Sequence, residues 1–160
     1  GMMGSGKTSI GLLVAKKLKL QFVDIDEVIE KELGKSIKEI FTKKGENFFR
    51  KFEEKITLRN LKSTPKVVSL GGGAFVNKTI RDEILKNHIS FWLNCSNQIL
   101  LDRIKKSKKR PLAYNLTQNE LIDLMNKRSL IYSKALHEIK CGNLSKSEIV
   151  EKVLNIYETH

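Results

Sequence analysis

The first eight residues of the chain, G-M-M-G-S-G-K-T, match the pattern G-x-x-x-x-G-K-[ST] in full. Glycines in such a loop let successive backbone N–H groups point at a polyphosphate, the lysine supplies a mobile cation, and the last hydroxyl can bind Mg²⁺. The apolar residues Ile10, Leu13, Val14 and Leu18 follow at helical spacing, and the N-terminus of a helix favours anions. The octapeptide therefore predicts a binding site for ATP or GTP.

Two acidic residues and three glycines follow short apolar runs farther along the chain. Asp24 and Asp26 lie at the end of the run 21–25, and the glycines 71–73 follow the run 67–70. Ligands bind beyond the carboxyl ends of strands in an open parallel sheet, so both groups are expected near the phosphate loop. One carboxylate can hold a Mg²⁺-bound water, and the other can accept a proton from an attacking hydroxyl. The alternatives are that Asp26 only caps a helix over 27–33 and that the glycines form only a flexible turn.

Arginine is scarce, with six residues among the 30 basic ones, so the position of each arginine is informative. Arg50 follows two phenylalanines, and Arg128 lies on a long predicted helix. A guanidinium group matches a carboxylate through two parallel hydrogen bonds, so the pair suggests an anionic acceptor. A surface ion pair of Arg50 with Glu46 or Glu53 is the alternative.

The basic stretch from Lys105 to Arg110 precedes Pro111 and interrupts the regular pattern of the chain. We expect a helix from Asn97 to end there and residues 105–116 to form a lid that closes over phosphates. A solvated surface loop is the alternative reading of the same composition.

The order of apolar segments predicts an α/β fold. Short runs at 21–25, 67–70, 89–93 and 138–141 alternate with longer segments of helical period, which indicates a mainly parallel central sheet. Capping-box spacing marks three helix starts, at Ser36, Thr117 and Ser145, and glycines at 34 and 45 lie where helices should end. A length of 160 residues suits one domain, and a phosphate loop normally follows a buried strand, so we expect a strand before Gly1 in a longer protein.

The formal charge of +12 comes mainly from lysines that are scattered among glutamates over predicted helix faces. Such a distribution is typical of solvated surfaces, and we expect no nucleic-acid partner. No run of 18 apolar residues occurs, so no membrane association is expected. The two cysteines lack metal-ligand spacing and suit reduced structural thiols. We expect a cytoplasmic monomer.

Seven motifs together resemble the shikimate kinase family in their order and spacing. They are G-M-M-G-S-G-K-T at 1–8, D-I-D at 24–26, S-I-K-E-I-F at 36–41, G-E-N-F-F-R at 45–50, G-G-G-A at 71–74, R-P-L at 110–112 and R-S-L-I-Y at 128–132. The resemblance implies one doubly wound P-loop kinase domain over 1–160, similar to nucleoside-monophosphate kinases, with a lid at 105–116 and a shikimate-binding helical segment at 26–62. It also implies transfer of the γ-phosphate of ATP, with Mg²⁺, to the 3-hydroxyl of shikimate in the pathway to chorismate and the aromatic amino acids.

The same resemblance implies roles for particular residues. Catalysis would depend on Lys7, Asp26 and Arg110. The nucleotide would be bound by Gly4, Ser5, Gly6, Lys7, Thr8, Ser9 and Arg110. Shikimate would be held by Asp26, Arg50, Gly71, Gly72, Gly73 and Arg128, and Mg²⁺ by Thr8 and, through water, by Asp24. Contacts with adenine are not assigned.

Two other functions remain open at this point. One is a kinase of another small polyol acid such as gluconate, on the same scaffold. The other is a P-loop ATPase that depends on nucleic acid, which the basic charge would suit. The arginine pair and Asp26 favour an acceptor that carries both a carboxylate and hydroxyl groups.

Overall fold

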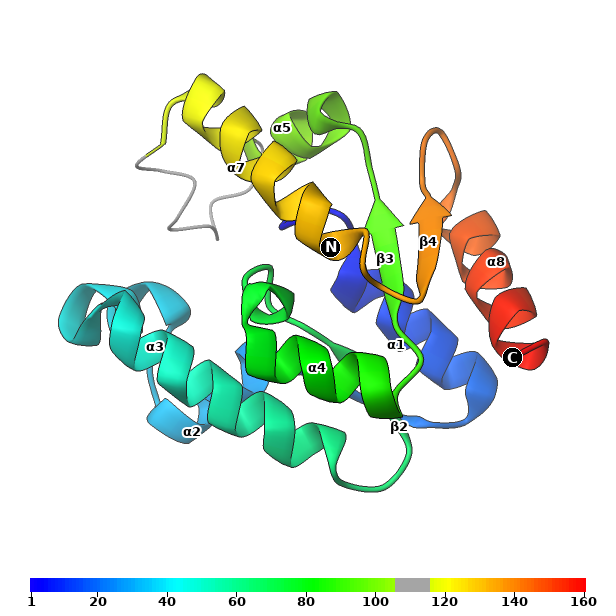
Figure 1. Cartoon of the computed structure of the whole chain (residues 1–160), viewed down its shortest axis with the longest axis horizontal. Helices are drawn as coiled ribbons and strands as arrows, with labels where there is room; N and C mark the ends of the chain where they lie inside the picture. The colour runs from blue at the N-terminus through cyan, green and yellow to red at the C-terminus, as the bar shows by residue number, and fades with distance from the viewer. Residues whose placement is uncertain (106–115) are drawn as a thin grey trace.

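The computed structural model of the chain describes residues 1–105 and 116–160. Its elements, in chain order, are α1 (Lys7–Leu18), β1 (Gln21–Asp24), α2 (Ile25–Leu33), α3 (Ile37–Leu61), β2 (Lys66–Ser69), the 3₁₀ helix η1 (Ala74–Val76), α4 (Lys78–Asn87), β3 (Phe91–Asn94), α5 (Asn97–Lys105), α7 (Gln118–Tyr132), β4 (His137–Lys140) and α8 (Lys146–Glu158). Helices separate the strands along the chain (Figure 1), which confirms the predicted α/β fold.

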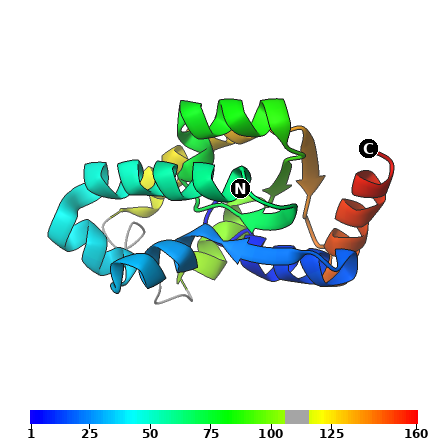
Figure 2. The same cartoon turned by 90° about the horizontal axis from the view of Figure 1, so that it is seen from below.

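The four strands form two parallel pairs. Gln21 of β1 lies opposite Lys66 of β2, and Phe91 of β3 lies opposite His137 of β4. Each strand begins and ends within two residues of its predicted position. Figure 2 shows α4 on one side of the strands and α1 on the other. Because both pairs are parallel, the carboxyl ends of partner strands lie at the same edge, where a site is expected.

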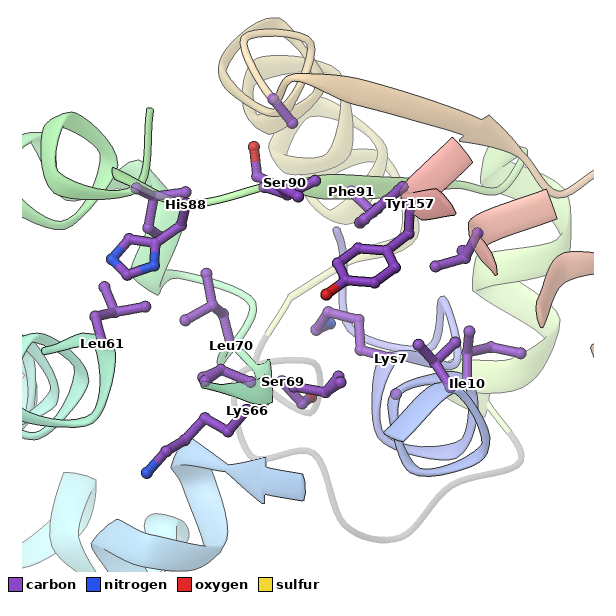
Figure 3. A pocket seen from close by; sticks show the side chains of 18 of the residues that line it. Lys7, Ile10, Leu61, Lys66, Ser69, Leu70, His88, Ser90, Phe91 and Tyr157 are labelled. Carbon is purple, nitrogen blue, oxygen red and sulfur yellow. The ribbon is translucent and has the colours of Figure 1, made fainter. Parts of the chain in front are cut away.

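Within the described residues the two strand pairs are separate sheets, so the predicted central sheet is divided. A cavity of about 490 Å³ lies between β2 and β3, and α1 and α8 also line it. Ile10, Phe91 and Tyr157 lie around this cavity in Figure 3. The strand expected before Gly1 stays a prediction.

Local side-chain bonds determine where several helices begin and end. The predicted capping boxes are all present: Ser36, Thr117 and Ser145 each exchange hydrogen bonds with the glutamate three residues later. Gly34 ends α2 in the left-handed conformation. Gly45, with φ 77° and ψ 167°, does not end α3 but kinks it, so two helical segments meet there.

Two hydrophobic clusters position the elements. The larger one joins residues of α1, β3, β4, α7 and α8. The smaller one lies between α2 and α3, which are neighbours in Figure 1, and contains Ile25, Ile29, Ile40, Phe49 and Ile56. Since Phe49 is buried, its neighbour Arg50 is held at a fixed point of the backbone. Among the described residues no helix is long and apolar enough to cross a membrane.

Candidate active site

The phosphate loop leads directly into α1. Gly4 and Gly6 have φ angles of 87° and 94°, a conformation that glycine adopts without strain. Gly6 is the N-cap of α1 and makes no side-chain cap, so the first N–H groups of the helix are left for a ligand. The Lys7 ammonium donates to the carbonyls of Gly1 and Met2, at 2.9 Å each, and therefore lies over the loop. The loop has the geometry of an anion site.

Asp24 joins this loop to α2. The Thr8 hydroxyl donates to Asp24 Oδ2 at 2.6 Å, and the other carboxylate oxygen accepts from the backbone N–H of Asp26 at 3.0 Å. Asp24 is thus the N-cap of α2, and the alternative that Asp26 caps this helix is wrong. The helix begins two residues earlier than that alternative required, which places Asp26 in its first turn. The carboxylate of Asp26 is consequently not needed for capping.

The side chain of Asp26 lies in a crowded acidic environment. Burial, together with the neighbouring carboxylates of Asp24 and Glu53, raises its pKa from 3.8 to about 6. Gly71 lies against the carboxylates of Asp26 and Glu53. A Cβ atom on Gly71 would lie 2.7 Å from Asp26 Oδ1 and 2.7 Å from Glu53 Oε1. Only glycine leaves room for both carboxylates at this end of β2.

Arg50 and Glu53 form a partly buried ion pair beside Asp26. Arg50 Nη1 lies 2.7 Å from Glu53 Oε2, and Nη2 lies 3.2 Å from Glu46 Oε1. Burial by itself lowers the pKa of Arg50, but the two carboxylates outweigh burial and raise it. The ion pairs considered from the sequence therefore exist. They do not leave Arg50 at the surface, because its Cζ would lie only 2.7 Å from a Cβ atom placed on Gly73.

Arg128 reaches the same glycine turn from α7. Its Nη1 would lie 3.7 Å from a Cβ atom on Gly72, and it donates to Met2 Sδ at 3.8 Å. One helical turn farther on, the hydroxyl of Tyr132 donates to the carbonyl of Gly72. The structure thus brings the two predicted arginines, the glycines and Asp26 together around one turn.

Three residues of this region were not assigned from the sequence. Glu53 was considered only as a surface partner of Arg50, yet its side chain is 2% exposed. Tyr132 belongs to the R-S-L-I-Y motif, and its position four residues after Arg128 was the available signal. Arg103 donates to the carbonyl of Gly4 at 3.0 Å, and no local pattern distinguishes it from the other basic residues of its helix.

Arg110 and most of the predicted lid at 105–116 lie outside the described residues. Ser9 lies in the first turn of α1 and is exposed. No group of three or more histidine, cysteine or acidic residues that could hold a metal occurs in 1–105 and 116–160. The oxygens of Thr8 and Asp24 still suit Mg²⁺, since this ion is usually held by one or two protein ligands together with substrate phosphates and water.

A family model described as shikimate kinase matches residues 3–158 of the chain. The chain belongs to the shikimate kinase family. The shikimate kinase of Bacillus subtilis is 42% identical over 156 residues, which cover 96% of this chain and 84% of the relative. That of Thermodesulfovibrio yellowstonii is 40% identical over 159 residues, which cover 99% of this chain and 92% of the relative.

Solved structures of shikimate kinases share the fold. The Acinetobacter baumannii enzyme in complex with shikimate matches with a TM-score of 0.90 and 29% identity, covering 99% of this chain and 90% of the other. The Aquifex aeolicus enzyme matches with a TM-score of 0.88 and 34% identity, covering 99% and 93%. The predicted family, P-loop kinase fold and enzyme class are confirmed, and the gluconate kinase and nucleic-acid-dependent ATPase alternatives are set aside.

The raised pKa of Asp26 predicts a pH-dependent stability. A folded-state pKa of about 6, above the ordinary 3.8, means that the folded chain binds this proton more tightly than the unfolded chain. The free energy of unfolding therefore falls as pH rises through this interval, by an amount on the order of 2 kcal/mol. Asp26→Asn should remove that loss, so the variant should be more stable than the wild type at pH 8 and equally stable at pH 4.

Urea denaturation of both proteins at the two pH values measures this effect. Asp82→Asn is the control, because Asp82 is exposed, pairs with Lys78 and has a lowered pKa. The control should gain nothing at pH 8. If the free energies of unfolding of Asp26→Asn and the wild type differed by the same amount at pH 4 and at pH 8, the raised pKa of Asp26 would be contradicted.

Proposed function

We propose that the residues around the glycine turn 71–73 carry out the family's reaction in this chain. The reaction transfers the γ-phosphate of ATP to the 3-hydroxyl of shikimate and yields shikimate 3-phosphate and ADP. The observation that carries the proposal is that Asp26, Arg50 and Arg128 meet at this turn, while Thr8 and Asp24 link the turn's surroundings to the phosphate loop. Residues 26–62, which form most of α2 and all of α3, are proposed as the shikimate-binding segment.

The donor half of the proposed site is the phosphate loop. The backbone N–H groups of residues 4–9 would surround the β- and γ-phosphates of ATP, and the positive end of α1 would favour their charge. The Lys7 ammonium, now bonded to the carbonyls of Gly1 and Met2, would transfer its hydrogen bonds to phosphate oxygens. Stabilising these oxygens is the main contribution that a protein can make to phosphoryl transfer.

Thr8 and Asp24 are the residues that would hold Mg²⁺ in the proposed site, Thr8 through its hydroxyl and Asp24 through a water molecule. When bound, Mg²⁺ neutralises the negative charge of the nucleotide phosphates. Asp24 has a second function that needs no metal, because the same carboxylate caps α2 and so positions Asp26.

In the acceptor half of the proposed site, different residues bind the carboxylate of shikimate and activate its hydroxyl group. Arg50 and Arg128 would hold the carboxylate of shikimate, and Glu53 would keep the guanidinium of Arg50 in position. Asp26 would orient the 3-hydroxyl and accept its proton. A pKa of about 6 suits this role, since such a carboxylate is ionised at neutral pH and yet basic enough to take a proton.

Further parts of the proposal concern partners and location. All residues of the proposed site come from one chain, so a monomer suffices and no nucleic acid is required. A cytoplasmic location is proposed because ATP is the phosphoryl donor.

The base assignment predicts a selective loss in Asp26→Asn. Turnover should fall by about 10²–10⁴-fold, because the amide cannot accept the proton, while the affinity for ATP should change less than about twofold. In the wild-type protein, turnover should decline as pH falls below the pKa of about 6. An ADP-release assay and a separate ATP titration measure the two quantities, with Asp82→Asn as the matched control. Near-normal turnover in a folded Asp26→Asn variant would remove Asp26 from the mechanism.

The carboxylate assignment predicts that Arg50→Ala and Arg128→Ala each lose about 30-fold or more in kcat/KM for shikimate. Shikimate methyl ester should be a poor substrate of the wild type, and the variants should discriminate less between acid and ester, because the discriminating group has been removed. Arg59→Ala is the control, since Arg59 pairs with Glu32 on the exposed surface. Equal use of acid and ester by the wild type would overturn the assignment.

The close approach at Gly73 predicts a graded effect of alanine substitutions. A Cβ atom on Gly73 would lie 2.7 Å from Arg50 Cζ, so Gly73→Ala should displace the Arg50 guanidinium. This displacement should lower kcat/KM for shikimate by about tenfold or more, because a misplacement of about 1 Å can already slow catalysis strongly. Gly72→Ala should be milder, since its Cβ atom meets nothing closer than 3.4 Å. In an Arg50→Ala background the loss from Gly73→Ala should shrink. Unchanged losses in the two backgrounds would show that the glycine does not act through Arg50.

A further inference from the structure

The two cysteines of the chain lie next to each other at the ends of β3 and β4. Asn94 and Lys140 are the last paired residues of these parallel strands, and Cys95 and Cys141 follow them. The backbone N–H of Cys141 donates to the carbonyl of Asn94 at 2.8 Å, which continues the pairing to this point. Both side chains are buried, and as the next pair in a parallel register they lie on the same face of the strands, where the Cys141 thiol donates to the carbonyl of Ile139 at 3.4 Å. A disulfide requires close and facing side chains of this kind.

Cys95 also contacts the phosphate loop. The thiol of Cys95 donates to the carbonyl of Ser5 at 3.8 Å. The Nη1 atom of Arg103 lies 4.0 Å from Cys95 Sγ and donates to the carbonyl of Gly4 at 3.0 Å. A change at Cys95 therefore reaches Ser5 of the loop directly and Gly4 through Arg103.

We propose that Cys95 and Cys141 form a thiol modification site, at which hydrogen peroxide converts the pair into a disulfide and thereby weakens the use of ATP by the phosphate loop. The modification goes beyond the phosphoryl-transfer reaction, and neither cysteine is among the residues assigned to that reaction. The oxidant is a molecule of about the size of water, and Arg103, whose Nη1 lies 4.0 Å from the buried Cys95 Sγ, is itself exposed.

The two thiols have different electrostatic environments. The neighbouring Cys141 thiol and the Arg103 guanidinium, 4.0 Å from Cys95 Sγ, lower the pKa of Cys95 to about 7 against the effect of burial. The neighbouring Cys95 thiol and burial raise the pKa of Cys141. Cys95 is therefore the nucleophile of the pair, and Cys141 is the thiol that attacks second.

The chemistry balances with peroxide as the only added reactant. The Cys95 thiolate attacks one oxygen of the peroxide, the O–O bond breaks, and the leaving hydroxide takes a proton to become water, which leaves a sulfenic acid on Cys95. The sulfur of Cys141 then attacks the sulfur of Cys95, the S–O bond breaks, and a second water leaves with the proton of the Cys141 thiol. The two cysteines lose two electrons and two protons, and the peroxide is reduced to water.

The disulfide would act on the loop in two ways. It removes the S–H group that donates to the carbonyl of Ser5, and it draws the ends of β3 and β4 toward each other beneath the loop. A displacement of about 1 Å in a catalytic constellation can lower the rate by about 10²-fold. We therefore expect the oxidised chain to lose about 10-fold to 10²-fold in kcat/KM for ATP.

The test is a titration of the whole chain with hydrogen peroxide, followed by quenching with a thiol-alkylating reagent in denaturant. The expected product has no free thiol, a mass lower by two hydrogen atoms, and a cross-linked peptide that contains Cys95 and Cys141. Its kcat/KM for ATP should fall as stated and return after treatment with dithiothreitol. The mass and the peptide are read without any assay of activity, so a failure of the proposed function would leave this part of the test intact.

Cys95→Ser and Cys141→Ser are the matched variants, with Cys95→Ala and Cys141→Ala as replacements if either serine variant fails to fold. Cys141→Ser should form a sulfenic acid but no disulfide, and Cys95→Ser should resist mild peroxide. Two free thiols persisting under peroxide that oxidises a small dithiol would overturn the proposal. So would full disulfide formation with unchanged kcat/KM for ATP, or an equal loss of activity in Cys95→Ser.

Discussion

The hydrogen bond from Thr8 to Asp24 connects the two halves of the site. Thr8 begins α1 beside the phosphate loop, and Asp24 ends β1 and caps α2, so one carboxylate fixes both helix starts relative to each other. Asp26 follows on the first turn of α2, and its distance from the loop is set by that cap. A single buried acidic residue, Asp24, therefore positions the phosphate loop and Asp26 relative to each other.

Several charged side chains lie partly or fully buried near the hydrogen bond between Thr8 and Asp24. Burial and the carboxylates of Asp24 and Glu53 raise the pKa of Asp26, and burial raises that of Glu53, which the guanidinium of Arg50 partly offsets. The glycine turn 71–73 makes this arrangement possible, because side chains there would occupy the space of Asp26, Glu53 and Arg50. Removing these charged groups from water destabilises the folded chain. Burial of the apolar cluster between α2 and α3 offsets this cost and holds the two helices that carry the charged groups.

Much of this structure follows from local sequence, and the rest depends on tertiary packing. The capping boxes at Ser36, Thr117 and Ser145 are complete within four residues, so their spacing predicted them correctly. The burial of Glu53 could not be predicted in this way, since its spacing from Arg50 is equally typical of an exposed pair, and only the packing of α3 decides between the two. Arg103 contacts a loop almost 100 residues earlier in the chain, a relation that no local pattern contains.

The capping boxes have an opposite dependence on acidity to that of Asp26. Hydrogen bonds from the cap residues lower the pKa values of Glu39, Glu120 and Glu148, so these carboxylates support the helix starts until acid protonates them. Asp26 instead favours the folded state when it is protonated. Together these four groups favour a mildly acidic medium, in which the caps are ionised and Asp26 is not. The unliganded chain should then be most stable at a pH at which Asp26, the proposed base, is protonated, so preparation and storage call for a lower pH than the proposed reaction does.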